Sequence, residues 1–108
     1  MNKLLKTKWI EALLSGNYRQ IKTRLTNRGK GRCCLGVLMD VAGFKKTRAY
    51  DNIGYKADNY GNIEFASLTY DFILSNDIKF ISVHKLIDMN DKENKSFEEI
   101  ASYIESNM

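Results

Sequence analysis

Six basic side chains and no acidic ones fall between positions 19 and 32 of the 108-residue chain. A run of this kind attracts phosphate groups or carboxylates, because each added lysine or arginine strengthens the local positive potential. An aromatic ring at one end of the run would let a nucleotide base stack beside its phosphates. The candidate binding residues are Tyr18, Arg19, Lys22, Arg24, Arg28, Lys30 and Arg32.

The sequence Gly29-Lys30-Gly31-Arg32 combines two of these cations with two glycines and runs directly into a predicted helix. Glycine adopts positive φ without a side-chain clash, so we expect a turn. Free backbone N–H groups where a helix begins attract anions, which makes this turn a candidate anion-binding loop. It lacks the patterns of nucleotide-hydrolysing and dinucleotide-binding loops, so hydrolysis is not indicated. The alternative interpretation is a solvated basic turn.

The two cysteines, Cys33 and Cys34, are adjacent and lie in an apolar run. A nucleophilic thiol needs exposure and a lowered pKa, and a metal site needs more ligands at wider spacing. His84 is the only histidine, and it has no partner in sequence that would make it a catalytic base. We therefore expect buried cysteines, no catalytic residues, no metal and no cofactor. A cysteine-dependent enzyme is the least favoured alternative.

Charge is distributed unevenly along the chain. Residues 1–48 carry twelve basic and two acidic side chains, a net charge of +10. Residues 88–108 carry two basic and six acidic ones, a net charge of −4. Such asymmetry predicts a basic surface that meets phosphate or an acidic protein. Two alternatives stay open, because the acidic stretch could fold back on this surface or dock on a second copy of the chain.

Length and composition predict one folded domain over residues 1–108. The chain is 44% hydrophobic and 28% charged, which is typical of globular proteins. A domain of this length hides roughly two-thirds of its unfolded surface, enough for a hydrophobic core. No apolar run approaches the roughly 20 residues of a membrane-spanning helix, and the N-terminal residues do not resemble a signal peptide. We expect a soluble cytoplasmic protein with no membrane partner.

The hydrophobic pattern predicts the elements that position the basic residues. Residues 3–15 have helical periodicity with Trp9 in the core, and Gly16 ends this helix. Residues 18–26 alternate as an extended segment with one cationic side. Residues 33–42 are nearly all apolar, and we interpret them as a buried central helix, with a strand as the alternative.

In the second half, residues 44–66 combine aromatic residues with turn formers and predict one or two hairpins. A short helix is expected at residues 68–73. Ser82 is expected to cap another helix that ends at Asn90-Asp91, where the amide and the carboxylate suit a turn and cap.

The last helix has the strongest local pattern. Ser96 and Glu99 form an S-x-x-E capping box, and Phe97, Ile100, Ala101 and Ile104 follow as one apolar stripe. The sequence therefore predicts an α+β fold. It has N- and C-terminal amphipathic helices and a buried central helix packed with a small antiparallel sheet.

Three motifs resemble a family of small bacteriophage proteins. They are WIEAL followed by SGNY in residues 9–18, CCLGVLxDxAG in residues 33–43, and ND at 90–91 followed by SFxEIAxxIE in residues 96–105. The likeness is weak in residues 44–81. It implies a phage origin rather than a particular activity. Relatives often have an aromatic residue where this chain has Arg32, so the basic site is expected to be particular to this protein.

Small phage proteins without catalytic residues often act by binding, which is an argument by analogy. The leading hypothesis is a non-enzymatic phage accessory protein in the host cytoplasm. Through its basic surface it would bind a host protein or a phosphate-bearing nucleotide ligand, and so counter host defence. The alternative is a small nucleic-acid-binding regulator that uses the same residues. A homo-oligomer fits either hypothesis.

Overall fold

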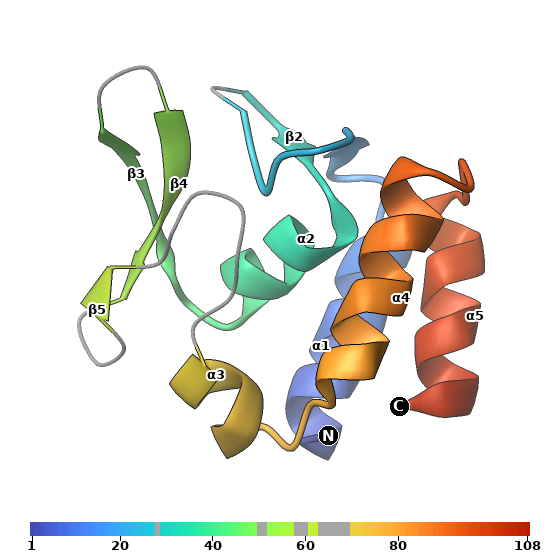
Figure 1. The fold of residues 1–108 in the computed structure, drawn as a ribbon. Helices are drawn as coiled ribbons and strands as arrows, with labels where there is room; N and C mark the ends of the chain where they lie inside the picture. Colours follow the sequence, from blue (N-terminus) through green and yellow to red (C-terminus); the bar gives the residue numbers. More distant parts are fainter. Residues whose placement is uncertain (28, 50–51, 58–60, 63–69) are drawn as a thin grey trace.

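The computed structural model describes residues 1–27, 29–49, 52–57, 61–62 and 70–108 (Figure 1). In these ranges the helices are α1 (Lys3–Leu14), α2 (Cys34–Val41), α3 (Tyr70–Ser75), α4 (Phe80–Asp91) and α5 (Phe97–Asn107). The strands are β1 (Arg19–Gln20), β2 (Gly31–Arg32), β3 (Lys45–Ala49), β4 (Asn52–Ala57) and β5 (Gly61–Asn62). The predicted α+β class is confirmed.

The core lies among α1, α2, α4 and α5. Helix α1 contacts α2 and α5, and α4 contacts the same two helices; in Figure 1 α4 lies in front of α1, with α5 beside it. Trp9 is fully buried, and its indole Nε1 donates to the carbonyl oxygen of Cys34 at 2.8 Å. All six residues from Cys34 to Met39 are buried. The prediction of a buried central helix is confirmed, and the strand alternative is wrong.

Local sequence sets several helix ends. The α1 helix is followed by Gly16 at φ +77°, and α2 is followed by Gly43 at φ +89°; both are left-handed conformations that favour glycine. In α5 the Ser96 hydroxyl accepts from the Glu99 N–H, and the Glu99 carboxylate accepts from the Ser96 N–H. The predicted capping box is confirmed.

The strands form two separate sheets in the described residues. β1 and β2 pair in parallel, with Arg19 opposite Gly31, whereas β3, β4 and β5 form an antiparallel sheet with Lys45 opposite Lys56. The hairpin predicted within residues 44–66 is confirmed by β3 and β4. A single antiparallel sheet is a wrong prediction, because the strands beside α2 are parallel. These strands are two residues long, so the bends between them can return the chain in the same direction.

The extended segment predicted for residues 18–26 is also wrong beyond Gln20. The backbone bends at Thr23, which has φ +63°, and the Thr23 N–H donates to Oδ1 of Asp91 at 3.0 Å. A β-branched residue rarely adopts positive φ. The bend therefore depends on a contact with a residue far away in the sequence, which no local pattern could predict.

Helix α4 begins before the predicted cap. Lys79 occupies the N-cap position without a side-chain hydrogen bond, so the assignment of Ser82 as the cap is wrong. The left-handed turn at Asp77, with φ +54°, starts the helix earlier than the sequence pattern suggested. The short helix expected at residues 68–73 is present as α3, although residues 68 and 69 lie outside the described ranges. No helix in the described ranges is long and apolar enough to span a membrane.

Candidate functional site

Arg32 does not project into solvent as the sequence suggested. Its Nε donates to Oδ2 of Asp40 at 2.8 Å, and its Nη1 donates to the carbonyl oxygens of Gly29 and Gly31 at 3.0 and 2.8 Å. Its side chain is 11% exposed. Charge-assisted hydrogen bonds of this kind are strong, so Arg32 braces the turn and α2 and has little freedom to bind a ligand.

Tyr18 lies against the same guanidinium. The Arg32 Cζ sits 5.8 Å from the centre of the Tyr18 ring, a cation–π contact. Desolvation raises the pKa of Tyr18, and the nearby Asp40 carboxylate raises it further. Arg32 thus covers one face of the ring that the sequence offered as a stacking platform.

The glycine turn is organised by Asn27. Its Oδ1 accepts from the N–H groups of Gly29 and Gly31 at 2.9 and 3.0 Å. The expected positive φ is not the reason for glycine here, because the positive-φ glycines of the described chain are Gly16 and Gly43. Gly31 is needed for space, since a Cβ there would lie 2.3 Å from Nδ2 of Asn27.

The N–H groups at the start of α2 are also engaged. The Cys33 N–H donates to the Leu25 carbonyl at 3.3 Å, and the Cys34 N–H donates to Oδ1 of Asn90 at 3.3 Å. Together with the Gly29 and Gly31 amides bound to Asn27, these donors are occupied within the protein. The expected anion-binding loop therefore loses four of its backbone donors.

Four predicted cations remain exposed: Arg19, Lys22, Arg24 and Lys30, hereafter the cationic group. The β1–β2 pairing brings two of them together, since the Arg19 N–H donates to the Lys30 carbonyl oxygen at 3.1 Å. Lys22 and Arg24 lie on the following bend, where Nζ of Lys22 donates to Oδ1 of Asn94. Arg28 lies outside the described residues.

The cationic group has no carboxylate partner within the described ranges. The ion pairs there join Arg32 to Asp40, Lys85 to Glu93, Lys92 to Asp88 and Lys95 to Glu99. The carboxylates of α5 are exposed, and none pairs with the cationic group among the described residues. The first residues of the acidic stretch do pack against the basic segment, since Asp91 accepts from the Thr23 N–H and Asn94 from Nζ of Lys22, but no carboxylate forms an ion pair with the cationic group among the described residues.

Asn90 positions this region from the opposite end of the sequence. Its side chain is 1% exposed, and its Oδ1 accepts from Nε2 of Gln20 at 3.0 Å as well as from Cys34. Its Nδ2 donates to the Ile21 carbonyl and to Oδ1 of Asp91, both at 2.8 Å. The pair Asn90-Asp91 is structural, but the expected turn and cap role is wrong: both residues lie within the last turn of α4, and their side chains hold the distant residues 20–23 and the start of α2.

The two thiols are buried, as the sequence predicted. Cys33 is 8% exposed and Cys34 is fully buried. Desolvation raises the pKa of Cys33 to about 11 and raises the pKa of Cys34 well above its ordinary value. Both thiols are protonated near neutral pH, whereas the thiolate is the nucleophile. Among the described residues, no cluster of three or more His, Cys, Asp or Glu side chains could hold a metal ion.

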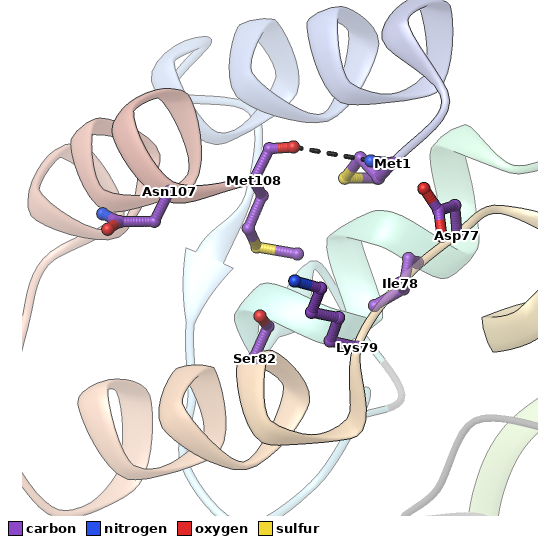
Figure 2. A pocket seen from close by; sticks show the side chains of 7 residues that line it. All are labelled: Met1, Asp77, Ile78, Lys79, Ser82, Asn107 and Met108. Atoms are coloured by element: carbon purple, nitrogen blue, oxygen red, sulfur yellow. Dashed lines mark hydrogen bonds between the residues drawn. The ribbon is translucent and has the colours of Figure 1, made fainter.

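Three hollows are lined by described residues. Figure 2 shows one of about 250 Å³ at the start of α4, where the Met1 amino group donates to the Met108 carbonyl oxygen at 3.4 Å. Asp77 and Lys79 line it with opposite charges. A second, of about 260 Å³, lies between α1 and α3 and includes Leu5. A third, of about 240 Å³, lies beside Arg24 of the cationic group.

The fold and these side chains define a small α+β protein with four exposed cations held on a tightly hydrogen-bonded segment. The chain belongs to the family described as a domain of unknown function (DUF8296), whose model matches residues 1–108. No curated protein matches the chain. No solved structure matches it either.

Proposed function

We propose that this chain is a non-enzymatic phage accessory protein that binds an acidic host protein in the host cytoplasm and counters host defence. The cationic group would form the centre of the binding surface. The phage origin rests on the sequence motifs, and the mode of action rests on the chemistry of the exposed side chains. Acidic protein surfaces and cations complement each other, which speeds encounter and selects the partner.

The observation that carries the proposal is the contrast between Arg32 and the cationic group. Arg32 is paired with Asp40, whereas Arg19, Lys22, Arg24 and Lys30 are exposed and make no ion pair within the described residues. The backbone between Arg19 and Arg24 is fixed by two hydrogen bonds: Asn90 Nδ2 donates to the Ile21 carbonyl oxygen, and the Thr23 N–H donates to Asp91 Oδ1. A fixed backbone lowers the entropy cost of binding, so unpaired cations on it suit recognition better than the same cations on a free loop.

The limited exposure of the Tyr18 ring favours a protein partner over a nucleic acid. Single-stranded nucleic acids gain affinity by stacking bases on exposed rings. Tyr18 is only partly exposed, and the Arg32 guanidinium covers one face of its ring. The small nucleic-acid-binding regulator therefore remains the alternative, and a phosphate-bearing nucleotide ligand is a further outcome that experiment can detect.

Affinity purification from infected host cells tests the proposal when charge variants are compared. The double variant Arg19→Glu/Lys30→Glu reverses two members of the cationic group. Lys3→Glu/Lys8→Glu is a matched control, because both lysines are exposed on α1 and the change in charge is identical. We expect a host protein to be recovered with the wild type and the control but lost with the Arg19/Lys30 variant. Equal recovery with all three proteins would contradict the proposal.

Binding to random-sequence DNA and RNA, measured at increasing salt concentration, distinguishes the nucleic-acid regulator from the protein-binding proposal. Phosphate contacts release counterions, so micromolar binding with a steep salt slope would support the nucleic-acid regulator. We expect no binding at physiological salt. Mass spectrometry of small molecules that co-purify with the protein would reveal a nucleotide ligand.

Thiol labelling tests the remaining enzyme hypothesis. Because burial raises the pKa of Cys33 to about 11, alkylation of the native protein should be slow and should become fast only after denaturant is added. Rapid labelling of one native thiol would instead point to a reactive cysteine.

A further inference from the structure

The hollow beside Arg24 is lined by apolar side chains from three parts of the chain. Leu25 comes from the bend, Leu35 from α2 and Ile87 from α4. Leu25 and Leu35 are 1% and 3% exposed, so core packing fixes their positions, while Ile87 is half-buried. We call this hollow the anchor pocket.

The size of the anchor pocket limits what can occupy it. Its volume of about 240 Å³ is below the roughly 300–1,000 Å³ of typical small-molecule sites. A single apolar side chain fits such a space better than a cofactor. Protein interfaces commonly place one anchoring side chain in a pocket of this kind, with charged or polar residues around it.

The charges around the anchor pocket determine which residues can flank the anchoring side chain in a bound segment. Arg24 lines the pocket and Lys22 lies two residues before it, and neither has a carboxylate partner among the described residues. Asp91 is the carboxylate in the lining. Its Oδ1 accepts from the Thr23 N–H at 3.0 Å and from Nδ2 of Asn90 at 2.8 Å, so this oxygen is engaged within the protein. Asp88, one turn earlier on α4, pairs with Lys92 at 3.5 Å.

We propose that the anchor pocket binds one aliphatic side chain of an acidic segment in the protein partner, with carboxylates on either side of it meeting Lys22 and Arg24. This inference rests on the proposed function and specifies the partner's chemistry. The pocket would make apolar contacts with the aliphatic side chain, and the two cations would orient the segment through its carboxylates. The Thr23–Asp91 hydrogen bond holds the bend next to Arg24, so that the pocket exists before binding.

NMR titration of the ¹⁵N-labelled full chain tests the inference. Two probes are used, the peptides Glu-Glu-Leu-Glu-Glu and Glu-Glu-Ser-Glu-Glu, which carry equal charge and differ only in the anchor. We expect the leucine peptide to bind about ten-fold more tightly, because burying a leucine side chain contributes about that factor. Its largest shifts should fall on the amides of Thr23, Leu25 and Ile87.

Two matched variants on α4 test whether the preference for the leucine peptide arises in the anchor pocket. Ile87→Thr makes the wall of the anchor pocket polar, and Ile81→Thr makes the same change at a residue of α4 that is 76% exposed and does not line the pocket. We expect Ile87→Thr to remove most of the ten-fold preference for leucine and Ile81→Thr to retain it. The ¹⁵N spectrum itself reports whether each variant is folded.

The outcomes separate this inference from the function on which it rests. Equal binding of the two peptides, weakened by Arg19→Glu/Lys30→Glu, overturns the anchor pocket while supporting the cationic surface. No binding of either peptide at 50 mM salt also overturns the anchor pocket, and the purification from host cells then decides the wider proposal independently. Loss of the leucine preference in Ile81→Thr as well as in Ile87→Thr overturns the assigned location.

Discussion

Helix α5 and the cationic segment from Tyr18 to Arg32 are held in the fold by different kinds of interaction. In α5 the capping box joins residues three apart, and the buried stripe repeats at helical spacing. In the cationic segment the glycine turn has local contacts from Asn27, but residues 20–23 are fixed by Asn90 and Asp91, roughly seventy residues away. The difference shows that this exposed segment depends more on tertiary structure than α5 does.

Removal of the Asn90 side chain should have the largest effect. Asn90→Ala eliminates four hydrogen bonds and leaves the buried Cys34 N–H and the part-buried Ile21 carbonyl without that partner. We expect the free energy of unfolding to fall by about 4 kcal/mol, since each unsatisfied buried group costs about 1–3 kcal/mol. Urea denaturation measures the change. Asn107→Ala is the control, because Asn107 is exposed on α5, and it should cost less than about 0.5 kcal/mol.

Asn90→Ala also tests whether the cationic segment depends on distant contacts more than α5 does. If the cationic segment depends on Asn90, amide exchange in residues 19–27 should accelerate more than exchange in the middle of α5. A uniform acceleration across both regions would contradict the distinction drawn between them.

Gly36→Ala should have the next largest effect. A Cβ at Gly36 would lie 1.8 Å from the Leu25 carbonyl oxygen, so α2 and the cationic segment must move apart. We expect a loss of about 2 kcal/mol, because overpacking in a core costs about 1–3 kcal/mol even where alanine favours the helix. Thermal denaturation measures it.

Gly29→Ala provides the matched glycine control. A Cβ there would meet Oδ1 of Asn27 at 3.7 Å, an ordinary contact, and Gly29 is exposed. We expect a change within about 0.5 kcal/mol. If the two alanine variants were equally stable, the close packing of Gly36 against Leu25 would not be present in solution.

Ser96→Ala should cost less, because it affects only the start of α5. The loss of the Ser96 hydroxyl removes one acceptor for the Glu99 N–H, and such N-cap replacements cost about 1 kcal/mol. The measurement is again urea denaturation, with the exposed Ser102→Ala on the same helix as control. A loss of 3 kcal/mol would mean that α5 also depends on tertiary contacts at its cap.

The smallest effect should come from the protonation of Glu99. Its hydrogen bond with the Ser96 backbone lowers its pKa, with the nearby Lys95 also contributing. A lowered pKa in the folded state stabilises the fold above the ordinary glutamate pKa, and the contribution is lost as pH falls through the folded value. Thermal melts from pH 5 to pH 3 should show a slightly smaller decrease for Glu99→Gln than for the wild type. Identical pH profiles would contradict a role for the ionised form.

The predicted site residues show how far residue type alone can predict exposure. Arg19, Lys22, Arg24 and Lys30 are exposed, because a run of lysine and arginine without acids has few ways to become buried. The sequence could not distinguish Arg32 from the others. Arg32 is neutralised because α2 places Asp40 beside it at 2.8 Å, and that distance depends on how the turn meets the helix.

No sequence pattern predicted the anchor pocket or the bend at Thr23. Thr23 adopts positive φ against its intrinsic preference, and its N–H is held by Asp91. The one available indication was the Asn90-Asp91 pair, which the resemblance included and which we assigned to a local turn. A turn role and a long-range role use the same two side chains, so sequence could not separate them.

The sequence by itself determined the long helices near the two ends, the buried central helix, the capping box and the supply of positive charge. Each of these follows from interactions between residues close together in the chain or from the transfer of apolar side chains out of water. Tertiary structure alone decided the parallel β1–β2 pair, the pairing of Arg32 and the positions of the exposed cations. Those features depend on directional hydrogen bonds between residues far apart, and such bonds form only once the core has brought their partners together.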